Sequence, residues 1–289
     1  MKKKFSGYDL IVVFFLILVA LLSIIPFVWS FISSLKTIEY NFQHPLSWIP
    51  RPIAFGNYAE VVKKIPFARY TINTLIYAGG KTIIALLLCP LAGHAFARKQ
   101  FKGKELFFIF VISLMMVPYQ VTIIPVFLIL KMFPLAGGNN IFGQGGTGLL
   151  NTYWGLILPS AVTPLNIFLM RQYFYSIPKS IEEAARIDGA SSFRIYWQIA
   201  LPLAKPALTA VGIFSFQGAW NDFIWPLIVC RTKDMYTLQL GLQVFQDETQ
   251  SQWPLLMAAT ILVTLPMLII FIIFQQYFFK GVSFAGSYR

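Results

Sequence analysis

The sequence predicts an all-α integral membrane protein with six transmembrane helices. Its composition excludes a water-soluble domain, because 57% of the 289 residues are hydrophobic, only 12% are charged and phenylalanine occurs 28 times. Six apolar stretches, mostly free of charge, are also long enough to cross a bilayer core of about 30 Å as helices. In chain order they are Leu10–Ile32, Tyr70–Phe96, Leu106–Leu130, Thr152–Met170, Pro206–Val229 and Pro254–Phe279.

The first apolar stretch, Leu10–Ile32, follows Lys2, Lys3 and Lys4 and therefore begins with the charge pattern of a secretory signal. Its apolar run is too long for a signal peptide, and no cleavage site of small residues follows it. We therefore expect a retained membrane anchor.

Lysine and arginine residues predict the orientation, because loops rich in these residues stay on the cytoplasmic side. With the N-terminus inside, most of them lie on that side, including Arg98, Arg171 and Arg194. Both termini and the loop between the fourth and fifth stretches are then cytoplasmic. This asymmetry and contact with anionic lipid headgroups account for the net charge of +12, so nucleic-acid binding is not expected.

Five prolines lie within the predicted spans: Pro118, Pro125, Pro164, Pro226 and Pro266. Each removes a backbone donor, which membrane helices tolerate where neighbouring groups or a water-filled cavity satisfy the freed carbonyls. Such positions are typical both of helices that line a moving pathway and of static kinks, and both interpretations stay open.

A lysine lies near the middle of the second span. There Lys81 costs about 2.5–3.5 kcal/mol on insertion scales, so it should face the interior of the helix bundle. Asp222 lies at a similar predicted depth in the fifth span. Two arrangements fit: the side chains pair or jointly face a pathway, or Lys81 extends toward the outer interface while Asp222 caps backbone groups.

The loop between the fourth and fifth spans carries the most specific motif, a segment of twenty residues that reads EAARIDGASSFRIYWQIALP from Glu183. Ser180 and Glu183 fit a capping box, and Gly189 fits a C-terminal cap. The pattern predicts a helix over Ile181–Asp188.

A second helix is expected to follow, capped by Ser191 and ended by Pro202. In the first helix, Ala184 and Ala185 share a face and are small enough for the close approach of a partner. Helix-cap chemistry alone fits both a docking segment and an ordinary amphipathic hairpin between spans.

The positions of Glu183-Ala184-Ala185, Gly189, Ile199 and Leu201-Pro202 resemble the cytoplasmic signature loop of the membrane-spanning subunits of bacterial ABC importers. Further segments extend the resemblance from about Asn73 to Lys280 and narrow it to carbohydrate-importer permeases of the maltose and glycerol-phosphate type. These segments are His94–Arg98, Val117-Pro118, Ile123–Pro125, Asn151–Pro159, Arg171-Gln172, Trp220–Phe223, Trp225–Leu227 and Thr237–Leu242.

The resemblance implies a type I ABC importer permease fold in the bacterial inner membrane. An N-terminal anchor helix and extracellular loop would occupy residues 1–69, the permease domain 70–280 and a cytoplasmic tail 281–289. The implied partners are a second, different permease subunit, two ATP-binding cassette subunits and an extracellular solute-binding protein. The ATPase-docking residues carried over with the motif are Glu183, Ala184, Ala185, Asp188, Gly189, Leu201 and Pro202.

Under this interpretation the chain is not an enzyme and needs no cofactor, because ATP is bound by the partner ATPase. Gly80-Lys81-Thr82 looks like the end of a phosphate-binding loop, but Leu75 replaces the required first glycine and the segment lies inside a span. Cys89 and Cys230 show no metal-ligand spacing and are expected to be buried packing residues.

The polar residues of the second and fifth spans are the candidates for a translocation pathway: Lys81, Gln217, Trp220, Asn221 and Asp222. In this interpretation the aromatic rings of Trp220, Phe223, Trp225 and Trp253 stack on sugar faces, while amide side chains supply hydrogen bonds. Tryptophans of the lipid interface are the alternative, which we favour for Trp253.

The sequence fits two other classes of protein less well. An ion-coupled secondary transporter calls for inverted repeats and intramembrane acids, yet no clear repeat is present and only Asp222 lies well within a span. A membrane-embedded enzyme calls for a nucleophile, base or metal cluster, which the sequence does not show.

The chain departs from the family pattern at two places. The segment Ala136–Thr147 is longer and richer in glycine than expected between the third and fourth spans. It fits a flexible external loop or a contact with the solute-binding protein. The tail Gly281–Arg289 differs from the usual glycine-rich ending, which leaves regulation at that end open.

Overall fold

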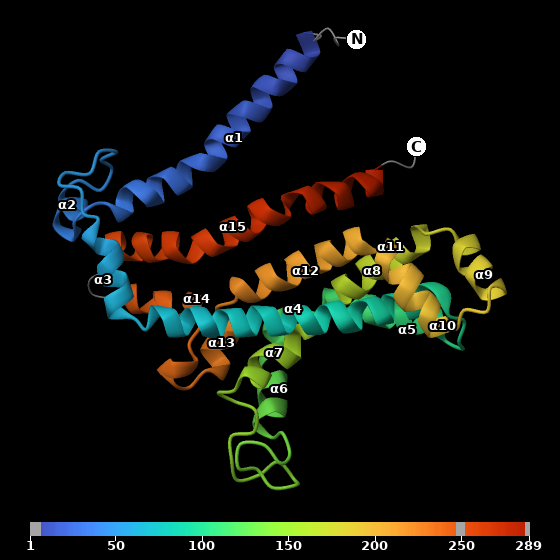
Figure 1. The fold of residues 1–289 in the computed structure, drawn as a ribbon. Helices are drawn as coiled ribbons and strands as arrows, with labels where there is room; N and C mark the ends of the chain where they lie inside the picture. Colours follow the sequence, from blue (N-terminus) through green and yellow to red (C-terminus); the bar gives the residue numbers. More distant parts are fainter. Residues whose placement is uncertain (1–6, 247–251, 287–289) are drawn as a thin grey trace. The chain divides into compact units, whose positions relative to one another are not determined.

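The computed structural model describes residues 7–246 and 252–286, and all regular secondary structure within them is helical (Figure 1). This agrees with the predicted all-α fold. The α-helices are α1 (Gly7–Ser34), α2 (Ile38–Gln43), α3 (Gly56–Lys64), α4 (Phe67–Arg98), α5 (Lys104–Ser113), α6 (Tyr119–Lys131), α7 (Tyr153–Ala161), α8 (Pro164–Ser176), α9 (Lys179–Ile187), α10 (Ser192–Ile195), α11 (Leu201–Leu203), α12 (Lys205–Trp220), α13 (Ile224–Val229), α14 (Leu238–Gly241) and α15 (Trp253–Gly286). Short 3₁₀ turns cover Leu114–Met116, Lys233–Met235 and Leu242–Phe245, and a π-helical segment covers Tyr196–Ala200.

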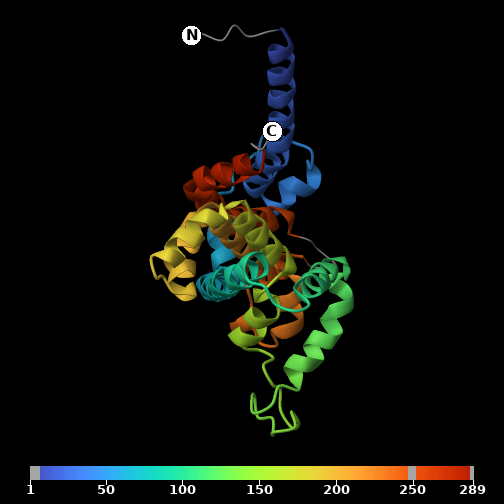
Figure 2. The ribbon, with the colours of Figure 1, turned by 90° about the vertical axis from the view of Figure 1, so that its right-hand side faces the viewer.

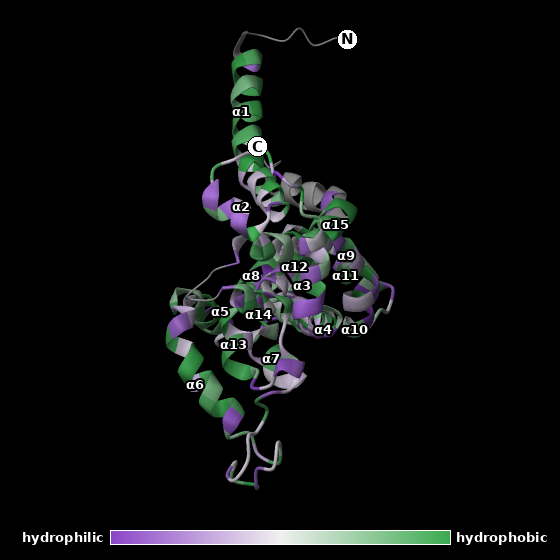
Figure 3. Cartoon of the chain, turned by 90° about the vertical axis from the view of Figure 1, so that its left-hand side faces the viewer, coloured by the Kyte–Doolittle hydropathy of each residue, from purple (hydrophilic) through white to green (hydrophobic). Residues whose placement is uncertain are grey.

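Three helical segments are long and apolar enough to cross a membrane: Asp9–Ser34, Phe67–Arg98 and Trp253–Ile273. Figure 3 shows the first of these, in α1, as hydrophobic along almost its whole length. Three bent helix pairs raise the number to six if each pair forms one span. They are Lys104–Met116 with Tyr119–Lys131, Tyr153–Ala161 with Pro164–Ser176, and Ser192–Leu203 with Lys205–Trp220, bent by 105°, 47° and 76°.

Two of the predicted proline positions mark sharp breaks. Val117 is extended at ψ 117° before Pro118, and Thr163 is extended at ψ 143° before Pro164. A residue before proline is driven out of the helical region by a clash with the proline ring, so the chain turns there. The other three prolines of the set lie inside helices, namely Pro125, Pro226 and Pro266.

The fifth predicted span, Pro206–Val229, is not one continuous helix. Helix α12 ends at Trp220, and the short helix α13 begins at Ile224. The Asp222 carboxylate accepts a hydrogen bond from the Trp225 N–H at 3.2 Å and so satisfies a backbone donor in the first turn of α13, whose N-cap Phe223 makes no side-chain bond. Hydropathy does not predict a local hydrogen bond of this kind, so the stretch was expected to form one continuous span.

The described residues divide into two compact units, residues 7–67 with 241–246 and 252–266, and residues 68–240 with 267–286. In the first unit, the turn after α1 is built around Lys36, which is fully buried. Its Nζ donates to the Pro45 carbonyl at 3.0 Å and lies 4.9 Å from the centre of the Trp29 ring. Burial lowers the pKa of Lys36. Asn57 of α3 closes the turn by donating to the Ser34 and Lys36 carbonyls.

In the second unit, α4 contacts α7, α8 and α12, and Figure 1 shows α12 running alongside it. Small residues allow the close crossings, as is common between membrane helices. A Cβ added at Gly93 would lie 2.6 Å from the Met170 Cβ in α8, and one added at Gly80 would lie 2.6 Å from Ile157 in α7. The core between these helices consists of Ala85, Cys89, Ala97, Ile167, Met170, Phe174, Ile177, Tyr196, Ala200, Ala204, Ala207 and Val211.

The glycine-rich segment Ala136–Thr147 is a loop whose backbone is held by hydrogen bonds. Buried Asn139 donates to the Lys131 and Phe133 carbonyls and accepts from the Gly146 N–H at 2.7 Å. A Cβ added at Gly146 would lie 2.1 Å from a backbone oxygen. Close backbone crossings therefore require glycine here. Figure 2 shows this loop beyond the end of α6.

The expectation for the two cysteines is confirmed. Cys89 and Cys230 are buried free thiols. The Cys230 Sγ donates to the Met235 carbonyl at 3.2 Å, and burial raises the pKa of this thiol to about 12. Both residues act as small packing groups.

Candidate functional site

The signature loop folds as two short helical segments joined by a tight turn, as predicted. The first, α9, begins at Lys179, so the predicted capping box is wrong. Ser180 already lies inside the helix, and the N-cap is Pro178, which makes no side-chain cap bond. The preceding proline sets the start of the helix more strongly than the Ser180–Glu183 spacing does.

The predicted cap at Gly189 is confirmed. Gly189 has φ +79°, its N–H bonds to the Arg186 carbonyl at 3.0 Å, and the Ala190 N–H bonds to the Ala185 carbonyl at 2.9 Å. This pair of bonds is a Schellman motif, which strongly favours glycine at the left-handed position. The turn fixes the direction in which the chain leaves α9.

The second helical segment runs from Ser192 to Leu203 through α10, the π-helical segment and α11. Ser191 caps it as predicted, since its Oγ accepts from the Arg194 N–H at 3.3 Å. Pro202 does not end the segment, contrary to expectation, but lies inside α11. Before it, the Leu201 N–H donates to the Tyr196 carbonyl in a π-helical bond, which accommodates the proline without breaking the helix.

The outer surface of this loop contains nearly all of the predicted docking residues. In and after α9, Glu183, Ala184, Asp188 and Gly189 are exposed, and Ala185 is partly buried. Leu201 is also partly buried and Pro202 exposed. Apart from its two chain neighbours, no atom of the described residues lies within 4 Å of a Cβ added at Gly189. The small residues therefore leave an open surface.

Three large apolar side chains beside this surface were not singled out from the sequence. Ile187, Phe193 and Trp197 are 87%, 73% and 52% exposed, and the two aromatic rings stack at 6.3 Å with an interplanar angle of 7°. The i, i+4 spacing of the two aromatic residues in a segment expected to be helical would have indicated this pair.

The opposite side of α9 is held by a buried ion pair. Glu182 is 6% exposed, and its Oε1 accepts from the Arg98 Nε of α4 at 2.7 Å. The same guanidinium donates to the Ile177 carbonyl just before α9. His94, one turn earlier on α4, has its Nε2 at 3.8 Å from the same carboxylate oxygen. Sequence reasoning missed Glu182, although two adjacent glutamates on so short a helix cannot both face the same way.

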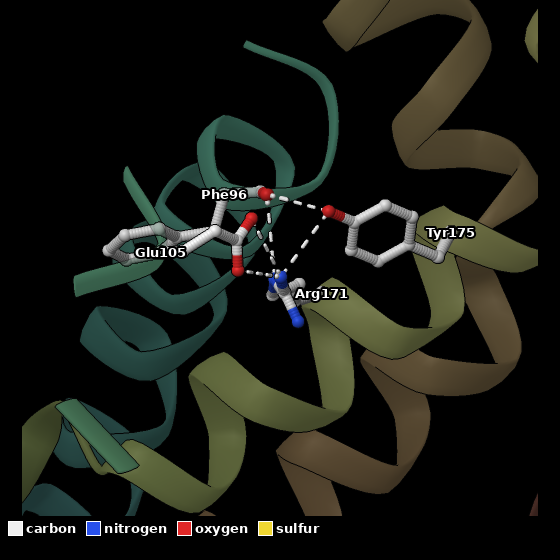
Figure 4. Close-up of polar contacts among 4 residues, drawn as sticks. All are labelled: Phe96, Glu105, Arg171 and Tyr175. Carbon is white, nitrogen blue, oxygen red and sulfur yellow. Dashed lines mark hydrogen bonds and ion pairs between the residues drawn. The ribbon is translucent and has the colours of Figure 1, made fainter. Parts of the chain in front are cut away.

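Arg171 of α8 joins the neighbouring helices near this site (Figure 4). Its guanidinium lies 3.6 Å from the centre of the Phe108 ring and donates to Glu105 at 3.1 Å and to the Tyr175 hydroxyl at 3.3 Å. Both Arg171 and Tyr175 also donate to the Phe96 carbonyl of α4. This cluster holds α8 against α4 and α5. Helix α9 therefore follows a helix whose position is fixed by these contacts.

The intramembrane charges lie near one another but form no ion pair within the described residues. Lys81 is 8% exposed, and its Nζ lies 6.0 Å from the centre of the Tyr77 ring and would be 3.9 Å from a Cβ at Gly218. The Tyr77 hydroxyl donates to Asp222 at 2.7 Å. The buried, inward-facing Lys81 agrees with the sequence, and Asp222 also accepts from the backbone Trp225 N–H at the start of α13.

The remaining pathway candidates differ in exposure. Gln217 and Asn221 are exposed, and Asn221 accepts from Gln239 at 3.4 Å. Trp220 is 1% exposed and stacks on Phe216 at 5.6 Å. Trp225 is buried and donates through its Nε1 to the Gly155 carbonyl at 3.1 Å. Both tryptophans therefore pack inside the second unit.

Comparison with known proteins identifies the family. The family described as binding-protein-dependent transport system inner membrane component matches residues 90–284. The arabinooligosaccharides transport system permease protein AraQ of Bacillus subtilis is 31% identical over 287 residues, covering 98% of this chain and 97% of AraQ. The diacetylchitobiose uptake system permease protein NgcG of Streptomyces coelicolor is 30% identical over 278 residues, covering 95% of this chain and 87% of NgcG.

A solved structure extends the similarity to three dimensions. A chain of a bacterial ABC transporter involved in the import of the acidic polysaccharide alginate matches with a TM-score of 0.78 and 26% identity, covering 96% of this chain and 100% of that chain. The type I ABC importer permease fold expected from the sequence is thereby confirmed. With its long apolar helices and these matches, the chain is a multi-pass membrane protein that belongs to the family of inner membrane components of binding-protein-dependent transport systems.

Proposed function

We propose that this chain is one permease subunit of an ATP-driven carbohydrate importer. It forms half of the transmembrane pathway and couples ATP hydrolysis by a partner to movement of a sugar. The observation that carries the proposal is the nearly full-length similarity to permeases named for arabinooligosaccharide and diacetylchitobiose uptake and to an alginate importer. The permease domain covers residues 70–280, after an anchor helix with an extracellular loop (1–69) and before a cytoplasmic tail (281–289).

The proposed complex contains a second, different permease, two ATPase subunits that bind the ATP, and an extracellular solute-binding protein. The exposed side of α9 and the turn at Gly189 receive an ATPase subunit, because small residues there leave room for a close approach. Exposed Ile187, Phe193 and Trp197 add apolar area, the kind of surface that marks a protein contact on the water-facing part of a chain. Leu201 and Pro202 connect this surface to α12.

The proposed pathway is lined by polar groups of α4 and the end of α12. Lys81 and Asp222 flank Tyr77, and exposed Gln217 and Asn221 offer amide groups that match sugar hydroxyls. Membrane helices carry such groups where they face a pathway or a partner, because lipid cannot satisfy them. Trp220 supports this surface from behind by packing in the core.

Uptake by the reconstituted complex tests the substrate class. The chain is purified with its partner permease, ATPase and binding protein, and labelled arabino-, chito- and uronate oligosaccharides and glycerol 3-phosphate are offered separately. We expect ATP-dependent uptake of a carbohydrate or sugar phosphate that needs every component. Labelled amino acids are offered in parallel, and a complete complex that takes up only these would contradict the proposal.

The proposed orientation places both termini and α9 in the cytoplasm, and labelling of single cysteines tests it. In a background with Cys89 and Cys230 replaced by alanine, exposed Gln144 and exposed Ser192 are each changed to cysteine. An impermeant maleimide should label Gln144→Cys in intact cells and Ser192→Cys only after the membrane is opened. Both should react in detergent. Labelling of Ser192→Cys in intact cells overturns the orientation.

A further inference from the structure

The attachment of α9 to α4 contains a buried hydrogen-bond donor that the described structure leaves unused. The His94 Nε2 is buried and has no hydrogen-bond partner among the described residues. It points to the Glu182 carboxylate, whose Oε1 lies 3.8 Å away, too far for a hydrogen bond. Buried polar groups are almost always satisfied, so an exception in a packed region calls for an explanation.

Packing holds His94 in place. Its ring meets those of Phe174 and Tyr196 edge-on, with centroid distances of 5.1 Å in both cases. Phe174 belongs to α8 and Tyr196 to the helical segment that follows the signature turn. The ring is therefore fixed by the two segments that flank α9, and only a movement of Glu182 can close the gap.

The current partner of Glu182 lies one helical turn away from His94. Arg98 and His94 are four residues apart on α4 and therefore lie on the same face. The Arg98 Nε is 2.7 Å from the Glu182 Oε1, and the two side chains are only 5% and 8% exposed. A shift of the carboxylate by about 1 Å would bring it within hydrogen-bond distance of the His94 Nε2.

We propose that Arg98, Glu182 and His94 form a two-position joint between α9 and α4. In the observed position Glu182 is bound by Arg98, and when a docked ATPase displaces α9 the carboxylate moves along α4 to bond with His94 as well. Separating the buried Glu182 carboxylate from both Arg98 and His94 would carry a large free-energy cost. Helix α4 must therefore move together with α9. These three side chains are thus positioning residues. They transmit the movement of the ATPase to α4, the helix that carries Lys81. This inference rests on the proposed function.

Glu182→Gln tests the joint in the complete transporter, because it keeps the shape of the side chain and removes the charge. We expect the complex to assemble and hydrolyse ATP, while the sugar taken up per ATP hydrolysed falls about tenfold. The double variant Arg98→Glu with Glu182→Arg should recover part of this ratio. The matched control is Glu60→Gln, an exposed carboxylate of α3 paired with Lys64 at 2.9 Å, which should leave the ratio unchanged.

His94→Phe tests the second position, since it keeps the ring packing and removes the donor. It should lower uptake per ATP in the wild-type background and have little further effect in the Glu182→Gln background, because both changes weaken the contact between His94 and residue 182. Independent effects that simply multiply would refute the two-position joint. So would a Glu182→Gln complex with normal uptake per ATP. If the wild-type complex itself shows no ATP-driven uptake, the proposed function fails instead.

Discussion

Replacing Gly93 with leucine is expected to lower strongly the amount of folded protein found in the membrane. A Cβ at this position would lie 2.6 Å from the Met170 Cβ and 2.9 Å from the Arg171 backbone nitrogen, so helix α8 itself would have to move. Overpacking of such a crossing costs about 3 kcal/mol. The larger loss comes from separating α4 from the core that it shares with α8 and α12.

The measurement is the amount of monodisperse chain extracted from membranes by mild detergent. Gly79→Leu on the same helix is the matched control, because a Cβ there would meet no described atom within 4 Å outside the helix's own backbone and its chain neighbours. Equal yields of the two variants would show that the α4–α8 crossing is not the tight contact that the structure gives.

Replacing Gly189 with valine is expected to abolish uptake while membrane insertion survives. The Schellman turn needs φ +79° at this residue, and a β-branched side chain there costs on the order of 1–3 kcal/mol. A change of turn redirects the chain between α9 and α10 and distorts the surface proposed to receive the ATPase. Uptake and co-purification of the ATPase are measured together.

Gly189→Asn is the control, because asparagine tolerates the left-handed conformation better than other side chains. It should retain most of the ATPase association that valine loses. A valine variant that transports normally with its ATPase attached contradicts the docking role of this turn.

Local sequence chemistry predicted the parts of the site that depend on neighbouring residues. Gly189 as a helix C-terminal cap and Ser191 as an N-cap follow from backbone requirements within a few positions. Hydropathy predicted α1 and α4 well, because a long apolar run without interruption has few alternatives in a bilayer.

Contacts between distant segments were not predictable from local patterns. The pairing of Glu182 with Arg98 joins residues 84 positions apart, and which of two adjacent glutamates turns inward depends on where α4 ends. The break after Trp220 likewise depends on Asp222, which bonds both to Tyr77 of α4 and to the backbone of α13. The close backbone crossings at glycines in the segment 136–147 likewise join positions that no local pattern brings together.

The most direct test of the account is the energy source for uptake in sealed vesicles that contain the complete complex. With the solute-binding protein and labelled sugar outside, uptake should require ATP on the side that α9 faces and should persist when ionophores remove all ion gradients. Replacing this chain with its Gly189→Val variant should abolish it. Sugar uptake that follows an imposed proton or sodium gradient without ATP would contradict the central claim that a docked ATPase drives transport through this chain.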